Sequence, residues 1–294
     1  MTSPRERLRR TMLLTPGSAR DRLAKAAASD ADCIVFDLED GVAPDRKAAA
    51  RSFVAEALET LDFGRRERLV RINAVGSDAY ALDLAALPLA ALDALFVPKV
   101  ESAAEIEALA HWLDGEERRL GLERRLALVA TIETARGLFA GLAIADASDR
   151  LAALFFGSGD YTAQTGAAIS ERGLAVPRAL VVAAAGAARL QAIDAAYFLA
   201  VKDAEATRQD ALIAREMGFS GKVVFHPGQI GVCNDVFTPT ADEIAQAERI
   251  VAAHARAVAS GEGVAYVDGQ FLAIDIVAMA ERTLAKAKAA GRIV

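Results

Sequence analysis

Two acidic residues, Glu133 and Asp160, each follow an apolar stretch of the sequence and could together hold a metal ion. The stretches cover residues 126–132 and 152–156. If they are neighbouring parallel strands, their carboxyl ends bring the two side chains to the same edge. Mg²⁺ is typically held by one or two carboxylates, with water and substrate oxygens completing its octahedron. The alternative for each carboxylate is a helix cap or an ion pair with a lysine.

A second acidic group, Asp37, Glu39 and Asp40, ends another apolar stretch, and Arg71 ends the next one. Several carboxylates in one cleft repel each other unless a cation neutralises them. An arginine in an apolar strand is costly to bury without an anion. Arg71 could pair with Asp37 or Glu39, or stabilise a substrate carboxylate or a developing oxyanion, and these roles are compatible.

Other polar residues give weaker signals. His226 is the one histidine that follows an apolar stretch, and packing or substrate contact would explain it equally well. Lys99 is the one lysine placed to form a Schiff base. Lys25 and Lys47 could meet phosphate groups. No Walker A motif is present, and no GxGxxG follows an apolar stretch.

The elements that would position these residues alternate along the chain. Eight strands are expected, at residues 12–15, 33–38, 69–72, 94–98, 126–132, 152–156, 196–201 and 222–225. Amphipathic helices are expected between them, at residues 20–28, 46–60, 103–113, 176–191 and 204–217. Alternating strands and helices favour parallel strands with right-handed crossovers, and eight such units predict an α/β fold, a closed (β/α)8 TIM barrel.

The C-terminal part changes pattern. We expect the barrel to occupy residues 1–230 and a helical extension, a lid or oligomerisation element, to occupy 231–294. In it we expect a helix at 242–260, a break at Gly261-Glu262-Gly263, a short apolar run at 264–267 and a last helix from about residue 274 to 289.

Composition limits the class of protein. Of 294 residues 53% are hydrophobic and 25% charged, with a net charge of −6, which excludes a disordered chain and disfavours a nucleic-acid binder. Long uncharged apolar stretches and a signal-peptide core are absent, so we expect no membrane partner. Cys33 and Cys233 predict two reduced, packed thiols and therefore a cytoplasmic protein.

Seven segments, in this order and spacing, resemble a known family: RTMLLTPG (10–17), DLEDGV (37–42), VRIN (70–73), VPKVE (97–101), IET (132–134), FGSGD (156–160) and GKVVFHPGQI (221–230). Each is weak alone, but the ordered set is specific. It is similar to the citrate lyase beta-subunit-like branch of the HpcH/HpaI aldolase superfamily, which includes malyl-CoA and citramalyl-CoA lyases. The resemblance covers the chain from about Arg7 to its end.

The resemblance implies a Mg²⁺-dependent carbon–carbon lyase that acts on a 3-hydroxy-3-carboxyacyl thioester and gives an acyl-thioester enolate and an oxo acid. It assigns the metal to Glu133 and Asp160, the substrate and enolate to Arg71, and metal-bound water to Asp37 and Glu39. It also implies that CoA contacts Lys25 and that the substrate is lined by Leu14, Gly159, His226 and Pro227.

The catalytic base has two candidate positions in the sequence. Related lyases carry a base Asp on the C-terminal extension and supply it to a neighbouring subunit, which implies a homo-oligomer, a trimer or hexamer. Aligned without a gap from Asp268-Gly269, that position is Ala273, whereas a two-residue shift places Asp275 there. Two alternatives stay open: a citrate lyase subunit acting on a citryl acyl carrier protein, and a metal-binding barrel without lyase activity that serves as a binding or assembly subunit.

Overall fold

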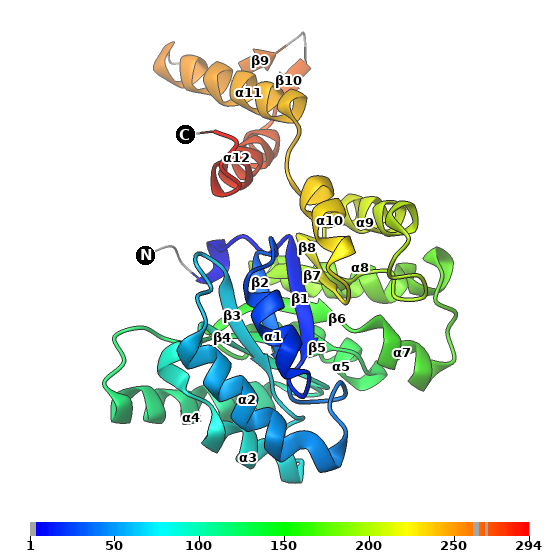
Figure 1. Cartoon of the computed structure of the whole chain (residues 1–294). Coiled ribbons are helices and arrows are strands. Elements are labelled where there is room, and N and C mark those ends of the chain that lie inside the picture. Colours follow the sequence, from blue (N-terminus) through cyan, green and yellow to red (C-terminus); the bar gives the residue numbers. More distant parts are fainter. Residues whose placement is uncertain (1–3, 261–264, 268–269, 294) are drawn as a thin grey trace. The chain divides into compact units, whose positions relative to one another are not determined.

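The computed structural model describes residues 4–260, 265–267 and 270–293 (Figure 1). The chain forms two compact units, one of residues 1–234 and the other of residues 235–294. The predicted break at Gly261-Glu262-Gly263, the start of the 264–267 run and the Asp268-Gly269 pair lie outside the described residues.

The first unit is built on a closed barrel of eight parallel strands, as predicted. The strands are β1 (Thr11–Pro16), β2 (Cys33–Asp37), β3 (Glu67–Arg71), β4 (Ala94–Val97), β5 (Ala127–Ile132), β6 (Leu151–Phe156), β7 (Gln191–Ala195) and β8 (Gly221–Val224). Each pairs with the next in sequence, and β1 also pairs with β8, where Met12 lies opposite Val223.

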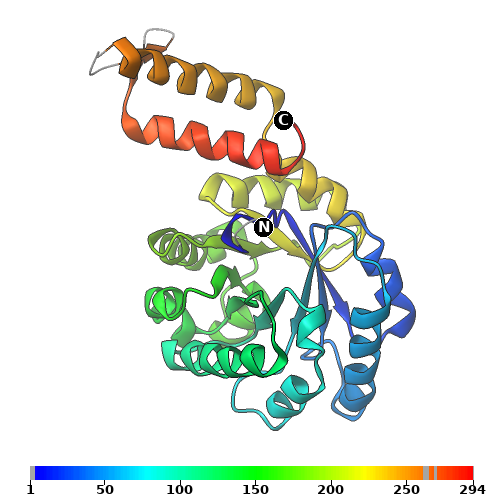
Figure 2. The same ribbon diagram turned by 90° about the vertical axis from the view of Figure 1, so that its left-hand side faces the viewer.

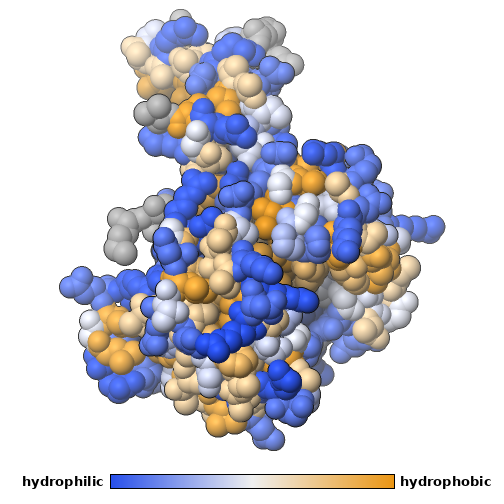
Figure 3. All heavy atoms as spheres, viewed as in Figure 1, coloured by the Kyte–Doolittle hydropathy of each residue, from blue (hydrophilic) through white to orange (hydrophobic). Residues whose placement is uncertain are grey.

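Helices alternate with these strands in sequence. They are α1 (Arg20–Ala27), α2 (Lys47–Thr60), α3 (Asp78–Ala86), α4 (Ala103–Leu120), α5 (Ala135–Phe139), α6 (Gly141–Asp146), α7 (Ser158–Thr165), α8 (Glu171–Ala187), α9 (Ala204–Met217) and α10 (Gly228–Phe237). Three 3-10 turns, Pro4–Glu6, Pro44–Arg46 and Leu89–Ala91, complete the unit. On the face shown in Figure 3, polar side chains are interspersed with apolar ones, as expected of helices that each bury one face.

The barrel interior is filled by alternate residues of the strands. Large side chains such as Phe96 and Phe155, whose rings are 5.3 Å apart, are combined with alanines such as Ala94, Ala127 and Ala153. Small residues beside large ones let the layers of side chains interdigitate without voids. Part of the high alanine content therefore belongs to the core of the barrel.

Ion pairs close the amino end of the barrel. Arg9 is fully buried and donates to both carboxylate oxygens of Glu67 at 2.6 and 2.7 Å, and Cys33 Sγ lies 3.3 Å from the same carboxylate. Burial and the Glu67 charge both raise the pKa of the Cys33 thiol well above its usual value. Cys33 and Cys233 are both free and buried, which confirms the prediction of two packed thiols.

The seventh strand was predicted in the wrong place. It spans Gln191–Ala195, not residues 196–201, and α8 ends at Ala187, where a left-handed Arg189 (φ 58°) closes the helix. Because this strand contains the charged Asp194, its sequence does not form an uninterrupted apolar run. The Asp194 carboxylate is fully buried behind the sheet, where it accepts from Lys222 at 2.5 Å and from Arg178 Nε at 3.3 Å. The more apolar residues 196–201 form a loop.

The second unit contains two long helices, α11 (Ala241–Ser260) and α12 (Ile274–Ala289), which lie side by side (Figure 2). A short antiparallel pair of strands, β9 (Ala265–Val267) and β10 (Gln270–Leu272), lies between them in sequence. Leu272 packs with Ala253 and Ala257 of α11 in a small core. Among the described residues, no helix is both long enough and apolar enough to cross a membrane.

Candidate functional site

Asp37, Arg71 and Glu133 lie at the carboxyl ends of β2, β3 and β5 and belong to the inward-facing series of their strands. In each strand the interior residues are two positions apart, for example Cys33 and Val35 before Asp37. Side chains in a strand alternate between faces, so this spacing directs all three into the mouth of the barrel. This is the end of the barrel at which active sites of this fold form.

Asp37 and Arg71 form a two-pronged ion pair. Arg71 Nε and Nη2 donate to the two oxygens of Asp37, each at 2.7 Å, across the β2–β3 register. The backbone N–H groups of Glu39 and Gly41 donate to the same carboxylate at 2.8 Å. Although burial works against the charge of Arg71, the hydrogen bonds and charge of Asp37 raise its pKa, so the guanidinium stays protonated.

Glu39 lies between two cations. Its Oε1 accepts from Lys99 Nζ at 2.6 Å, while its Oε2 lies 3.2 Å from Arg71 Nη1 without accepting a hydrogen bond. The side chain is only 4% exposed. Burial raises the pKa of Glu39, and Arg71 and Lys99 oppose that shift. The site therefore holds one buried carboxylate oxygen that no described donor satisfies.

Glu133 is the most strongly perturbed carboxylate of the site. It is 3% exposed, and its Oε1 accepts the backbone N–H of Lys99 at 2.8 Å. Burial, followed by the charges of Glu39 and Asp160, raises its pKa to about 8. Gly157 leaves room for it, because a Cβ at that position would lie 2.5 Å from Glu133 Oε2. Such a carboxylate favours a nearby cation.

Asp160 lies in the first turn of α7, directly after β6, and its side chain is 43% exposed. Its Oδ2 is 3.8 Å from Lys99 Nζ, which also contacts Asp40 at 2.8 Å. Glu133 and Asp160 thus come from neighbouring strands and contact opposite ends of one residue, Lys99.

The donor set fits a hard divalent cation. Carboxylates outnumber cationic side chains in this cluster by five (Asp37, Glu39, Asp40, Glu133 and Asp160) to two (Arg71 and Lys99). In the described part of the chain, no three His, Cys, Asp or Glu side chains form a complete metal cage. Mg²⁺ needs only one or two protein carboxylates, so Glu133 and Asp160 could hold it, and the unsatisfied oxygen of Glu39 could accept from its water.

The predicted substrate-lining residues occupy several strand ends. Leu14 of β1 packs against the barrel interior, and a Cβ at Gly159 would lie 3.8 Å from the ring of Phe198. Phe198 is in edge contact with Phe225 at 6.1 Å. His226 and Pro227 follow β8, where His226 Nδ1 accepts the N–H of Gly228 at 3.0 Å.

Two further predicted residues lie on helices. Lys25 is exposed on α1. Asp275 is exposed in the first turn of α12, which belongs to the second unit.

The sequence did not reveal what Lys99 and Lys47 contact. Lys99 is held by two carboxylates whose hydrogen bonds outweigh its burial and raise its pKa, which disfavours the neutral amine that a Schiff base requires. Lys47 donates to the Leu38 and Glu39 carbonyls and to Asn73 Oδ1 at 2.6–3.0 Å, so it braces the acidic loop rather than facing a phosphate. The signal for Lys99 in the sequence was its place directly after the predicted strand at residues 94–98.

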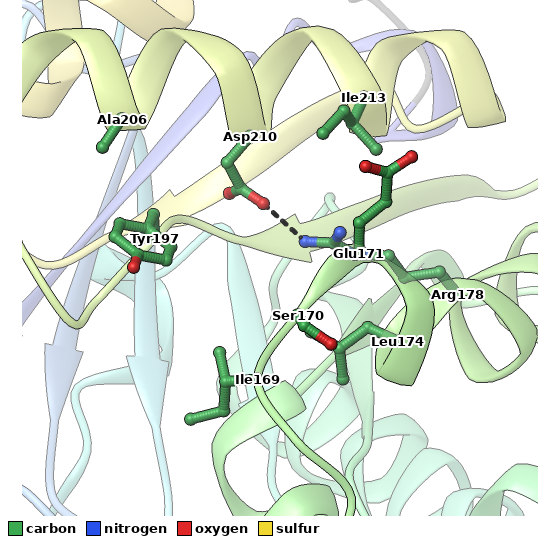
Figure 4. Close-up of a pocket in the computed structure, with 9 residues that line it drawn as sticks. All are labelled: Ile169, Ser170, Glu171, Leu174, Arg178, Tyr197, Ala206, Asp210 and Ile213. Carbon is green, nitrogen blue, oxygen red and sulfur yellow. Dashed lines mark hydrogen bonds and ion pairs between the residues drawn. The ribbon is translucent and has the colours of Figure 1, made fainter.

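A separate pocket of about 200 Å³ lies beside the N-terminal halves of α8 and α9 (Figure 4). None of the predicted site residues line it. Its walls include Leu174, Tyr197 and Ile213, and Arg178 and Asp210 pair at 2.8 Å within it. Arg178 and Asp210 therefore neutralise each other within the pocket.

Comparison with known proteins identifies the family of this chain. Residues 10–227 match the family described as HpcH/HpaI aldolase/citrate lyase. The chain is 39% identical over 282 residues to a (3S)-malyl-CoA thioesterase of Cereibacter sphaeroides, covering 95% of both chains. It is 35% identical over 287 residues to the citrate lyase subunit beta of Leuconostoc mesenteroides, covering 97% of this chain and 95% of that one. It is 32% identical over 288 residues to human mitochondrial citramalyl-CoA lyase, covering 94% and 84%.

Solved structures agree as well. CitE from Mycobacterium tuberculosis, in complex with magnesium, acetoacetate and coenzyme A, has a TM-score of 0.75 and 32% identity, over 97% of this chain and 99% of that one. RipC from Yersinia pestis has a TM-score of 0.65 and 36% identity, over 80% and 97%. The chain is an enzyme of the HpcH/HpaI aldolase/citrate lyase family.

Proposed function

We propose that this enzyme is a Mg²⁺-dependent carbon–carbon lyase that cleaves a 3-hydroxy-3-carboxyacyl thioester such as citramalyl-CoA or malyl-CoA. The observation that carries the proposal is the arrangement of Arg71 between the acidic loop and the Glu133–Asp160 pair at one mouth of the barrel. The CitE structure with magnesium and coenzyme A, and the relative named citramalyl-CoA lyase, support both the metal and the substrate class.

Glu133 and Asp160 would hold the metal, and Asp37 and Glu39 would accept from its water. When bound, Mg²⁺ supplies Lewis-acid polarisation of the hydroxyl and carboxylate oxygens of the acid half. Because Asp37 also fixes Arg71 by two hydrogen bonds, the same carboxylate would link the cation site to the guanidinium.

Arg71 would act on the thioester half. Once a base removes the hydroxyl proton, the bond between the hydroxyl carbon and the acyl α-carbon breaks. Its electron pair passes to the thioester as an enolate, and an oxo acid is released. The Nη1 of Arg71, which donates no hydrogen bond to Asp37, is the group available to stabilise the enolate oxygen. Protonation of the enolate then gives the acyl thioester.

The base is proposed to be Asp275, supplied by a neighbouring copy in a homo-oligomer. Ala273, at the gap-free position, has no acid–base group, whereas the Asp275 carboxylate is exposed. An oligomer is supported by Phe139 and Val176, which are 87% and 68% exposed on the adjacent helices α5 and α8. A second copy would cover such an apolar surface. The molar mass measured by light scattering would distinguish a trimer from a hexamer.

The rest of the proposal concerns recognition. Lys25 is proposed to contact CoA phosphates, and Leu14, Gly159, His226 and Pro227 to line the acid half. We also retain a cytoplasmic location, which the two buried free thiols support.

The test is an assay of the purified enzyme with malyl-, citramalyl- and citryl-thioesters, with Mg²⁺ and with EDTA. We expect Mg²⁺-dependent release of glyoxylate or pyruvate together with acetyl-CoA, and loss of release in Glu133→Ala. Thioesters that stay intact after prolonged incubation with metal would refute the proposal.

Hydrolysis is the second candidate, because relatives at 39% identity are named (3S)-malyl-CoA thioesterase. The two reactions differ in products: hydrolysis gives free CoA and malate, whereas cleavage gives acetyl-CoA and glyoxylate. The same assay therefore separates them. A carrier-bound substrate, suggested by the citrate lyase beta relatives, would be processed only as the carrier-protein thioester. Metal binding without turnover of any thioester would leave the binding-subunit alternative.

A further inference from the structure

Lys99 has an unusual backbone. Among the described residues, only Lys99 (φ 51°) and Arg189 are non-glycine residues in the left-handed region. Arg189 ends a helix, which is a common use of that conformation. Lys99 ends no helix; it follows Pro98 at the carboxyl end of β4. Unfavourable backbone conformations of this kind persist where surrounding contacts fix them, and they cluster at functional sites.

The conformation lets one residue reach both proposed metal ligands. The Lys99 backbone N–H donates to Glu133 Oε1 at 2.8 Å. The N–H of the next residue, Val100, donates to the carbonyl oxygen of Thr131 on β5. The side chain runs the other way, to Glu39 at 2.6 Å, Asp40 at 2.8 Å and Asp160 at 3.8 Å.

We propose that the Lys99 ammonium is the resident counter-ion of this site and competes with Mg²⁺ for it. Before the metal enters, the ammonium offsets part of the negative charge of Glu39, Asp40 and Asp160; for the metal to bind, it must give up Asp160. Lys99 thereby sets the metal affinity below the value that the carboxylates alone would give. The proposal rests on the proposed function in taking Glu133 and Asp160 as the ligands.

Two observations support competition rather than simple bracing. The ammonium is closer to Glu39 and Asp40 than to Asp160, so it could leave Asp160 and keep two partners. The Nζ also leaves Glu39 Oε2 without a hydrogen bond, although that atom is buried beside it. The ammonium therefore offsets only part of the negative charge of this cluster and does not complete its hydrogen bonding, which leaves an acceptor for metal-bound water.

The experiment measures metal binding in the absence of substrate. Binding of Mn²⁺ by electron paramagnetic resonance, and of Mg²⁺ by its competition with Mn²⁺, is compared for the wild type, Lys99→Met and Lys202→Met. Lys202 is exposed, so its substitution removes the same unit of charge without touching the carboxylates. We expect Lys99→Met to bind the metal about tenfold more tightly, and Lys202→Met to match the wild type.

Thermal unfolding separates competition from a structural role. Without metal, Lys99→Met should melt below the wild type, because its carboxylates lack their counter-ion, and saturating Mg²⁺ should close most of that gap. A structural role would lower the melting temperature equally with and without Mg²⁺ and leave the affinity unchanged. If Lys99→Met does not fold, Lys99→Gln serves in its place.

The outcomes distinguish this inference from the proposed function. Equal or weaker metal binding in Lys99→Met overturns the inference, while the lyase assay is unaffected by that result. If the wild type binds no divalent cation but Lys99→Met does, the inference holds and the Mg²⁺-dependent lyase is refuted. If neither binds, both fail.

Discussion

Asp37 holds Arg71 through two parallel hydrogen bonds of 2.7 Å, and its own carboxylate is held by two backbone N–H groups. The guanidinium is therefore fixed by a carboxylate that is itself fixed by the main chain. Such support determines how accurately a catalytic group is aimed.

Asp37→Asn tests this support. The amide removes the negative charge and turns one acceptor into a donor that faces Arg71, so the guanidinium loses its orientation. We expect kcat to fall about 100-fold and the unfolding free energy by about 3 kcal/mol, because the buried guanidinium loses its hydrogen-bonded counter-charge and keeps only its ion pair with Glu39. Steady-state kinetics and urea denaturation check these values. Wild-type kcat in a folded Asp37→Asn enzyme would show that Arg71 needs no such support.

Arg71→Lys tests whether the planar guanidinium, with its several parallel donors, is needed at this position. Lysine keeps the charge but cannot donate in two parallel directions to Asp37 while presenting a third donor to substrate. We expect kcat to fall by about 100-fold or more, with Mn²⁺ affinity within about twofold of the wild type. A parallel loss of metal binding would mean that Arg71 acts mainly on the carboxylates.

Glu133 predicts a pH dependence of stability. Its pKa is about 8 in the folded protein and near 4.5 in the unfolded chain, so between these values the folded state binds the extra proton. Stability contributed by this group is therefore present at low pH and lost as pH rises toward 8, by up to about 1.4 kcal/mol per unit. Urea denaturation in EDTA from about pH 5 to 8 should show a smaller decline in Glu133→Gln. Equal slopes in both proteins would contradict the shift.

Gly157→Ala tests the space beside Glu133. The new Cβ would lie 2.5 Å from Glu133 Oε2 and 2.6 Å from Glu133 Cβ, so the carboxylate must move. We expect Mn²⁺ binding to weaken about tenfold or more, in a protein that still folds. The matched control is Gly115→Ala in α4, where nothing lies within 4 Å and the helix should gain up to about 1 kcal/mol. Unchanged metal affinity in Gly157→Ala would mean that Glu133 is not a ligand.

Asp275→Asn tests the proposed base. We expect kcat to fall about 100-fold or more, with substrate and metal affinity retained, because only proton transfer is lost. Glu281→Gln, an exposed position on the same helix, controls for the change of charge. Turnover at the wild-type rate in Asp275→Asn would assign the base to another residue.

Much of the site could be predicted because it obeys a simple rule. A polar residue that ends an apolar strand points into the mouth of the barrel when it lies an even number of positions after the core residues of that strand. Asp37, Arg71 and Glu133 all do so. The register of the strands then sets the Asp37–Arg71 pair directly. The strand count alone was enough to predict the closed barrel.

The misplaced strand and the contacts of Lys99 depend on interactions that no local pattern reveals. β7 contains Asp194, which a sequence pattern assigns to a surface, yet distant partners on α8 and β8 neutralise it. Lys99, whose backbone is left-handed, likewise donates its N–H to Glu133, 34 residues away. Local apolar runs therefore misplaced a strand whose polarity is compensated from elsewhere in the chain.

The buried group behind β7 also limits how the sequence can change. Arg178 and Lys222 each contact both Asp194 and Asp210, so two cations and two anions balance in a largely buried group. Replacing one of these residues leaves a buried charge without a counter-charge, whereas replacing an oppositely charged pair does not. These four positions should therefore covary among relatives, and divergence should proceed through paired exchanges that keep α8 and α9 attached to the barrel.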